Sequence, residues 1–321
     1  MSCVIATTSP VFGTVGKVPQ FIADRGWELI RCIDKSRPDG GLAEHLGRVD
    51  FLVAGLLPVK AGQLDAAPNL KAVLKHGVGV DNIDIAAATG RKIPVLNAPG
   101  GNTNAVVELT IGDMIVLARH LPKACADIRN QNWERQVGSE IAGKTLGIVG
   151  FGNIGKSLAL AASALGMRIL ATDLYPDYIF AEEHGVTLAD MENVLRKADY
   201  VTLHIHGGKD NVNCIGETQL AMMKPTAFLI NNARGDVVDL DALDRALKNN
   251  ALAGAAIDAF PVEPPDFSHP IFANPKALLT PHAGGDTAES SERVGMMNVT
   301  DIETLLKGGR APRILNPEIY H

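Results

Sequence analysis

The sequence predicts an α/β protein made of two doubly wound parallel-sheet domains, and two observations lead to this prediction. Short apolar runs of strand length alternate with segments of helical spacing along nearly the whole chain. This pattern is typical of right-handed strand–helix–strand units in parallel sheets. A turn-rich stretch followed by a long apolar segment, residues 97–121, divides the alternation into two series. The length of 321 residues also suits two domains of ordinary size.

The first series occupies about the first hundred residues. Its short apolar runs predict buried strands at residues 3–6, 27–32, 51–56, 71–76 and 93–97. The segments between them have helical spacing and often end at a glycine, which predicts helices at residues 18–26, 41–47, 60–67 and 84–90. We expect these elements to form one parallel sheet covered by helices.

The second series predicts strands at residues 145–150, 168–173, 200–205, 227–232, 253–258 and 277–282, again with helices between them. A last long helix is expected at residues 288–309. We therefore expect a first domain of residues 1–98 and 286–321, into which a second domain of residues 99–285 is inserted. The two chain crossings, near Asn97–Thr103 and Gly284–Ala288, are expected to act as a hinge.

The composition excludes several classes of protein. Hydrophobic residues make up 46% and charged residues 21% of the chain, which favours a large core over disorder. The formal charge of −6, without a run of Lys or Arg, argues against a nucleic-acid partner. Cys3, Cys32, Cys125 and Cys214 are far apart, so we expect free thiols rather than disulfides or a metal site. With neither a signal-peptide pattern nor 18 consecutive apolar residues, we expect a cytoplasmic protein without a membrane partner.

The strongest motif is Gly150-x-Gly152-x-x-Gly155, which lies between a predicted strand and a predicted helix. In such a turn the three glycines allow a tight bend, close approach of the backbone to a pyrophosphate, and close helix–sheet packing. The first helical turn, with Asn153 and Ile154, offers unpaired N–H groups and the positive end of the helix dipole to phosphates. The motif therefore predicts a dinucleotide-binding Rossmann domain.

Asp173 ends the strand that follows this helix. It stands 18 residues after Gly155, close to the ~20 residues expected for an acid that binds the adenosine ribose. A carboxylate there accepts hydrogen bonds from ribose hydroxyls and repels a 2′-phosphate, so NAD is favoured over NADP. The alternative is an aspartate that merely ends a strand.

Three residues that could perform chemistry follow later strands of the second series. Arg234, Glu263 and His282 all lie in turns rich in glycine or proline, at the edge where ligands bind in such sheets. An arginine can hold a carboxylate through two parallel N–H bonds, and a histidine can exchange a proton with a hydroxyl. A glutamate bonded to that histidine would orient it and keep it protonated for carbonyl reduction.

Each of these residues also has a purely structural interpretation when it is taken alone. Arg234 could be a surface residue, Glu263 a solvated loop carboxylate, and His282 a histidine that caps a turn. Their common placement after strands of one sheet favours the catalytic interpretation.

The sequence resembles the D-isomer-specific 2-hydroxyacid dehydrogenases, especially the phosphoglycerate dehydrogenase-like branch. The stretches that carry the resemblance appear in the family's order, at residues 76–119, 143–155, 223–247, 252–265 and 274–285. The resemblance implies a Rossmann NAD-binding domain inserted into a flavodoxin-like substrate-binding domain. It also implies a homodimer, formed through the NAD-binding domain around the long helix after residue 103.

The resemblance implies a role for individual residues. Arg234 matches the arginine that holds the substrate carboxylate, His282 the catalytic acid/base, and Glu263 its partner. Asp258 matches a residue that contacts the nicotinamide carboxamide, and Asp173 the ribose acid. Further expected cofactor contacts are His204, Ala233 and Gly285.

A second glycine-rich loop, Gly77–Asn82, matches a substrate-side loop of the family. Its backbone N–H groups, at Gly77, Val78 and Gly79, are expected to bind the carboxylate. By itself the loop is only a glycine-rich turn after a strand.

Some positions depart from the family pattern. Ala54 stands where phosphoglycerate enzymes commonly have an arginine, and Lys75 followed by His76 stands where they tend to have another. Lys75 could replace a phosphate-binding cation, or Lys75 and His76 could serve another anion, and His76 could equally be a strand-end histidine with its bonds satisfied. His206 replaces a proline of the family. The chain ends about 40 residues after His282, so serine feedback through a C-terminal regulatory domain is not expected.

Together these features predict an NAD-dependent oxidoreductase that transfers a hydride between nicotinamide and a small D-2-hydroxy or 2-keto acid. An acid similar to 3-phosphoglycerate is among the candidate substrates. Two alternatives remain: an NAD-binding corepressor-like scaffold without turnover, and a phosphite dehydrogenase. Formate enzymes of this fold carry Gln at the position of Glu263, which argues against formate.

Overall fold

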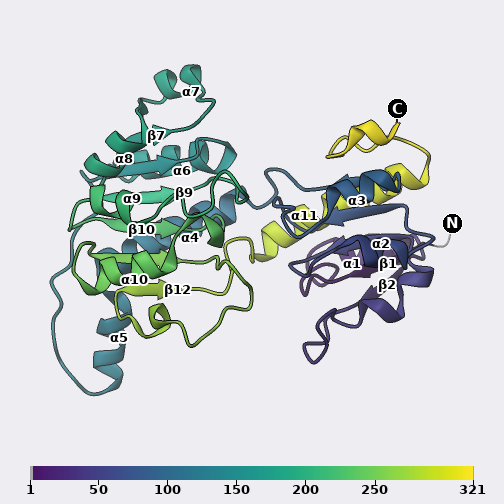
Figure 1. Cartoon of the computed structure of the whole chain (residues 1–321), viewed down its shortest axis with the longest axis horizontal. Helices are drawn as coiled ribbons and strands as arrows, with labels where there is room; N and C mark the ends of the chain where they lie inside the picture. The colour runs from purple at the N-terminus through teal and green to yellow at the C-terminus, as the bar shows by residue number, and fades with distance from the viewer. Residues whose placement is uncertain (1–2, 321) are drawn as a thin grey trace. The chain divides into compact units, whose positions relative to one another are not determined.

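The computed structural model describes residues 3–320, and the chain forms two compact units (Figure 1). One unit consists of residues 1–102 and 285–321, and the other of residues 103–284. Residues 1, 2 and 321, which the sequence analysis assigned to the first domain, lie outside the described part. Each unit is built on one parallel sheet, so the predicted fold class is confirmed.

The first unit has a five-stranded parallel sheet of order β2-β1-β3-β4-β5, the order of flavodoxin-like folds. Its strands are β1 (Val4–Thr7), β2 (Glu28–Arg31), β3 (Phe51–Ala54), β4 (Ala72–Lys75) and β5 (Val95–Leu96). Its α-helices are α1 (Val18–Asp24), α2 (Ala61–Asp65), α3 (Ile85–Gly90) and α11 (Ala288–Leu306). A 3₁₀ turn, η5 (Pro317–Tyr320), ends the described chain.

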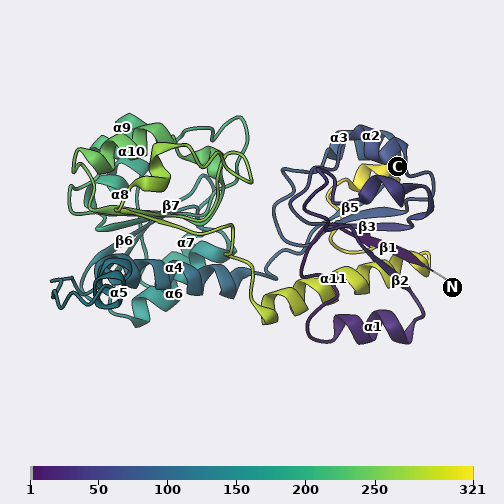
Figure 2. The same cartoon turned by 90° about the horizontal axis from the view of Figure 1, so that it is seen from below.

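Both faces of this sheet are buried. On β3, Leu52 packs in one apolar cluster with residues of α2 and α3, whereas Val53 packs in another with residues of α1 and α11. Successive strand residues point to opposite faces, and Figure 2 shows the two helix pairs on the two sides of the sheet. This burial explains why the inner strands β1, β3 and β4 are nearly continuous apolar runs.

The prediction of a helix at residues 41–47 is wrong. The structure has two 3₁₀ turns instead, η1 (Leu42–Glu44) and η2 (Leu46–Arg48). The Asp39 carboxylate accepts the backbone N–H groups of Gly41 and Ala43, and Gly41 has a φ of 88°. The Asp39 bonds cap the start of η1, and Gly41 and Gly47 disfavour a continuous helix in so short a segment.

The second unit has a seven-stranded parallel sheet of order β12-β11-β10-β9-β6-β7-β8. Its strands are β6 (Thr145–Val149), β7 (Arg168–Thr172), β8 (Thr187–Leu188), β9 (Tyr200–Leu203), β10 (Phe228–Asn231), β11 (Gly254–Ile257) and β12 (Ala277–Leu279). The short β8 was not predicted. Strand order reverses beside β6, whose neighbours are β7 and β9, so its carboxyl end is the switch point where dinucleotides bind.

Helices cover both faces of the second sheet. They are α4 (Thr103–Ala118), α5 (Leu121–Arg129), α6 (Asn153–Ala164), α7 (Tyr178–Glu183), α8 (Met191–Lys197), α9 (Glu217–Met222) and α10 (Leu240–Lys248), with 3₁₀ turns η3 (Gly235–Val237) and η4 (Pro270–Ala273). The long helix expected after residue 103 ends at Ala118, because His120 adopts a left-handed φ of 51° and α5 starts after it. Within residues 3–320, no helix combines the length and apolar character needed to span a bilayer.

Candidate active site

The glycine motif forms the turn between β6 and α6. A side-chain Cβ at Gly150 would lie 2.4 Å from the carbonyl oxygen of His204, and one at Gly155 would lie 2.2 Å from that of Gly150. By contrast, a Cβ at Gly152 would meet no atom of the described chain within 4 Å. The first and third glycines are therefore required by packing, while the second faces open space that a pyrophosphate could enter.

The donors expected for a phosphate are in place at this turn. Asn153 and Ile154 form the first turn of α6, where backbone N–H groups have no partner within the helix. The Asp173 carboxylate accepts the N–H groups of Phe151, at 2.6 Å, and of Tyr175, at 2.8 Å. Asp173 thus joins the carboxyl ends of β6 and β7, and its carboxylate has further lone pairs for ribose hydroxyls. These residues fit a dinucleotide.

His204, an expected cofactor contact, follows β9 behind this turn. One ring nitrogen, Nε2, lies 3.0 Å from the Thr202 hydroxyl, and Nδ1 is buried without a partner in the described chain. Burial lowers the pKa of His204 to about 4, so the ring is neutral at physiological pH. Its carbonyl lies against Gly150, which gives His204 a supporting position. His206, in contrast, is exposed.

The structure brings Glu263 and His282 into direct contact. Nδ1 of His282 lies 2.7 Å from Oε2 and 2.9 Å from Oε1 of Glu263. The Phe260 N–H also donates to Oε1. Burial raises the pKa of Glu263, but the hydrogen bonds from His282 and Phe260, together with the positive charges of His282 and Arg234, outweigh it, and the pKa lies below its usual value. The carboxylate is therefore ionised at neutral pH and accepts the Nδ1 proton of His282.

Asp258 holds the backbone on which His282 stands. Its carboxylate accepts the Thr280 hydroxyl at 2.6 Å and the N–H groups of Ala283 and Gly284 at 2.7 and 2.8 Å. Its carbonyl oxygen accepts the His282 N–H, and His282 has a left-handed φ of 55°. The side chain expected to contact a carboxamide is therefore also the anchor of the histidine turn.

Arg234 follows β10 in a turn fixed by Asn231. The Asn231 amide donates to the Arg234 carbonyl at 2.8 Å and accepts the Ala233 N–H at 3.2 Å. A Cβ at the next residue, Gly235, would lie only 1.9 Å from the carbonyl carbon of Phe260. The turn that carries Arg234 therefore packs backbone to backbone against the segment that leads to Glu263. This packing explains why Arg234 lies close enough to lower the pKa of Glu263.

A buried polar group behind this turn was not identified from the sequence. The Asn232 amide donates to the Thr110 hydroxyl at 3.1 Å and to the Asp113 carboxylate at 2.9 Å, both on α4. Asp113 is only 4% exposed, and burial, with a smaller contribution from Asp258, raises its pKa to about 6. The available signal was an acidic residue inside the apolar run "LTIGDMIVLA".

Two further predicted site residues lie at the end of β4 in the first unit: Lys75 is its last residue and His76 follows it. Lys75 is 6% exposed, and its ammonium donates to the Gly55 carbonyl and to Oδ1 of Asn82, each at 2.7 Å. Nδ1 of His76 lies 3.1 Å from the Ser9 hydroxyl, Nε2 is buried, and the ring also interacts with the Ser291 backbone. Burial lowers the pKa of His76 to about 4, so His76 is neutral at physiological pH.

The Gly77–Gly79 loop continues from these residues. Its three residues are half-buried, yet within residues 3–320 the N–H groups of Gly77, Val78 and Gly79 donate to no acceptor. Consecutive unpaired backbone donors form an anion-binding concavity. Gly285, predicted as a cofactor contact, is the residue at which the chain enters the first unit again.

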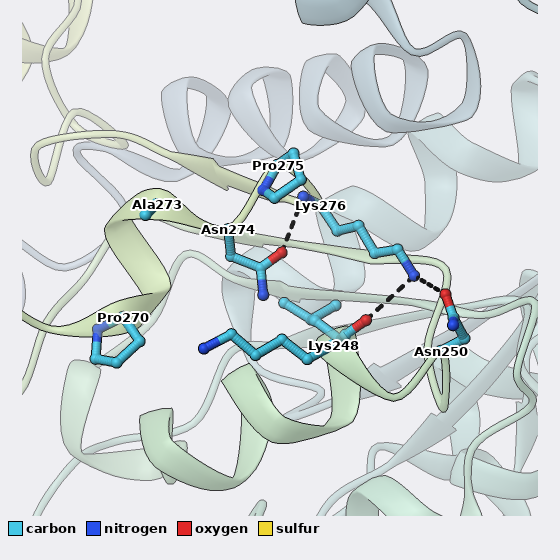
Figure 3. A pocket seen from close by; sticks show the side chains of 8 residues that line it. Lys248, Asn250, Pro270, Ala273, Asn274, Pro275 and Lys276 are labelled. Atoms are coloured by element: carbon cyan, nitrogen blue, oxygen red, sulfur yellow. Dashed lines mark hydrogen bonds between the residues drawn. The ribbon is translucent and has the colours of Figure 1, made fainter.

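The surface hollow drawn in Figure 3 lies apart from these residues. Its volume is about 370 Å³, and it is lined by the end of α10 and the segment before β12, including Lys248, Asn250 and Lys276. Lys276 precedes β12 and His282 follows it, so the hollow lies at the opposite end of the sheet from the histidine. No group of three or more potential metal ligands occurs among the described residues.

Comparisons with known proteins agree with this geometry. The family model of the D-isomer specific 2-hydroxyacid dehydrogenase NAD-binding domain matches residues 111–284. The chain is 37% identical over 296 residues to a glyoxylate reductase from Thermococcus litoralis, and the match covers 89% of both proteins. It is 40% identical over 260 residues to a D-3-phosphoglycerate dehydrogenase from Archaeoglobus fulgidus, and that match covers 80% of this chain and 49% of that protein. The chain thus spans about half the length of that relative.

A solved structure shows the same two-unit fold over nearly all of the chain. The TT0316 protein from Thermus thermophilus is similar with a TM-score of 0.88 and 30% identity, and the match covers 98% of this chain and 100% of that protein. These matches confirm the family predicted from the sequence, and with it NAD(H) as the cofactor. The chain therefore belongs to the D-isomer specific 2-hydroxyacid dehydrogenase family, whose NAD-binding domain it carries at residues 111–284.

Proposed function

We propose that this protein is an NAD-dependent dehydrogenase that reversibly transfers a hydride between nicotinamide and carbon 2 of a small D-2-hydroxy or 2-keto acid. The observation that supports it most is the bonded Glu263–His282 pair beside Arg234, in a unit that belongs to an NAD-binding family. This set offers a proton donor, a group that orients it, and a cation for a carboxylate.

The proposed acid/base is His282. Since Glu263 accepts the Nδ1 proton, Nε2 is the nitrogen available for proton exchange with substrate. Bound NADH supplies the hydride for carbon 2 of the keto acid. Nε2 of the protonated ring gives its proton to the carbonyl oxygen, which becomes the hydroxyl. In the oxidative direction Nε2 takes the hydroxyl proton, and the ionised Glu263 stabilises the resulting imidazolium.

Arg234 is proposed to hold the substrate carboxylate through its planar guanidinium. In the first unit, the unpaired N–H groups of Gly77, Val78 and Gly79 are proposed to bind an anionic group of the substrate. His76, which is neutral and bonded to Ser9, is proposed as an uncharged polar contact. In the cofactor-binding unit, Gly152, the first turn of α6 and Asp173 are proposed to bind the pyrophosphate and ribose.

The test is a panel of 2-keto acids with NADH. We propose glyoxylate, hydroxypyruvate and 3-phosphohydroxypyruvate as the first members, because relatives named glyoxylate reductase and D-3-phosphoglycerate dehydrogenase match the chain. Steady-state oxidation of NADH by at least one member, with formation of the D-hydroxy acid, is the expected result. Intact NADH binding without turnover on any member would contradict the proposal and favour a scaffold.

We also propose a homodimer formed through the second unit. Large apolar side chains on and after α5 face solvent in the single chain, with Trp133 84% and Val137 93% exposed. Such exposure is typical of an interface. Light scattering should give twice the monomer mass for the native protein and a smaller mass for Trp133→Glu.

The free thiols of Cys3 and Cys32 fit a reducing compartment, and we propose a cytoplasmic location.

A further inference from the structure

Lys75 is the last residue of β4 and is almost completely buried. Its ammonium donates to the Gly55 carbonyl and to Oδ1 of Asn82, at 2.7 Å in both cases. Burying an ammonium costs free energy unless hydrogen bonds compensate. The two bonds therefore fix Nζ between the segment that follows β3 and the segment that follows β4.

Asn82 extends this link. The nitrogen of its side-chain amide donates to the carbonyls of Gly55 and Leu57, at 2.9 and 2.7 Å. Its backbone carbonyl accepts the Val59 N–H at 2.8 Å. The Gly55–Val59 segment is thus bonded to Asn82 through both side chain and backbone. Lys75 donates hydrogen bonds to both sides of this link, Gly55 and Asn82.

This link anchors one end of the loop that carries the unpaired N–H groups. Gly77–Gly79 lies between Lys75 and Asn82 in the chain. It is held from another side by the Asn97 amide, which donates to the Val78 carbonyl, and by the Ala98 N–H, which donates to the Gly77 carbonyl, each at 2.8 Å. The carbonyls of Gly77 and Val78 are thereby engaged by the protein, and the N–H groups of the loop remain for a ligand.

We propose that Lys75 is a positioning residue, which holds the Gly77–Gly79 loop in its anion-binding shape by tying Asn82 to Gly55, and is not a phosphate ligand. The inference rests on the proposed function, because it concerns how a 2-keto acid is bound. The proposal distinguishes between two roles of Lys75 that the sequence leaves open. A phosphate ligand matters only for a phosphorylated substrate, whereas a positioning residue matters for every keto acid that the loop binds.

The test compares Lys75→Met with the native protein on an unphosphorylated keto acid that the panel shows to be a substrate. A displaced loop is expected to raise KM about 10-fold or more, since a shift of about 1 Å in a binding group can cost as much as 100-fold. The dissociation constant for NADH should stay unchanged, because the cofactor-binding unit is untouched. Lys71→Met is the matched control: this lysine precedes the same strand and is half-exposed, and its loss should leave KM unchanged.

Asn82→Ala and the double variant Lys75→Met/Asn82→Ala complete the test. If both residues act through one link, the double variant should raise KM no more than the worse single variant does. Asn82→Ala also serves if Lys75→Met fails to fold. An unchanged KM for the unphosphorylated acid in Lys75→Met, or in Asn82→Ala where the former is unfolded, would overturn the inference. So would fully additive effects. Failure of the native protein to reduce any keto acid would instead refute the proposed function.

Discussion

Nδ1 of His282 lies 2.7 Å from Oε2 of Glu263, although the two residues are 19 positions apart in the chain. Both oxygens of the carboxylate face the same ring nitrogen. The bond directs Nε2 away from the carboxylate and assigns the Nδ1 proton. The chemistry expected of this protein depends on this pair and on the residues that hold it.

Replacing His282 by Ala should remove the proton donor. We expect kcat for keto-acid reduction to fall by at least ~100-fold, the usual contribution of a general acid, with NADH affinity unchanged. Glu263→Gln should lower kcat less and change the pH dependence of kcat, because a neutral amide cannot stabilise the imidazolium. Stopped-flow and steady-state kinetics over pH 5–9 measure both effects, and near-native turnover of His282→Ala would remove it from the acid/base role.

Replacing Arg234 by Lys keeps the charge but loses the planar fork. We expect KM for the keto acid to rise by roughly 10- to 100-fold, the weight of one hydrogen bond to a charged group. NADH binding, measured by fluorescence titration, should not change. An unaltered kcat/KM would argue that Arg234 does not hold the carboxylate.

Gly152 and Gly155 allow a matched pair of variants. Gly152→Ala adds a methyl group in open space, so the melting temperature without cofactor should stay native while NADH no longer raises it. Gly155→Ala forces a Cβ against the Gly150 carbonyl and should lower the free energy of unfolding by at least ~2 kcal/mol. Thermal melts with and without NADH distinguish the two. A native NADH response in Gly152→Ala would contradict the proposed pyrophosphate site.

Asp173 is expected to set the preference for NADH over NADPH. Its carboxylate repels a 2′-phosphate, and the segment Asp173–Phe180 contains no Lys or Arg to attract one. Asp173→Ser should therefore weaken NADH binding and raise the ratio of NADPH to NADH activity. The ratio of kcat/KM for the two cofactors is the measurement. A native protein that already prefers NADPH would refute the assignment.

Asp113 should make stability depend on pH. Burial raises its pKa to about 6 from 3.8, so the folded state binds this proton more tightly than the unfolded state. Its favourable contribution is complete below pH 4 and is lost as the pH rises through 6, a change of at most about 3 kcal/mol. Asp113→Asn should lose this part of the pH dependence. Urea unfolding between pH 4 and 7 measures it, and parallel curves for the two proteins would contradict the prediction.

Much of the fold followed from local signals. The apolar runs predicted both parallel sheets because strands covered on two faces have no polar side, and the glycine motif marked the switch point at β6. The prediction of a helix at residues 41–47 was wrong for a local reason, since Gly41 and Gly47 disfavour a continuous helix in so short a segment. The two-residue β8 gave too short a run to be recognised.

The sequence by itself determined the kind of site, whereas the tertiary structure decided how its parts are held. Arg234, Glu263 and His282 could be selected because of their chemistry, their positions after strands and a family resemblance. Their spacing could not be predicted, because it depends on contacts between distant segments. The close approach of Gly235 to Phe260 and the bonds from Asp258 to the His282 turn are contacts of this kind. Lys75 shows the same limit: a lysine beside a glycine loop suggests an anion ligand, and only the folded chain places its ammonium on Gly55 and Asn82.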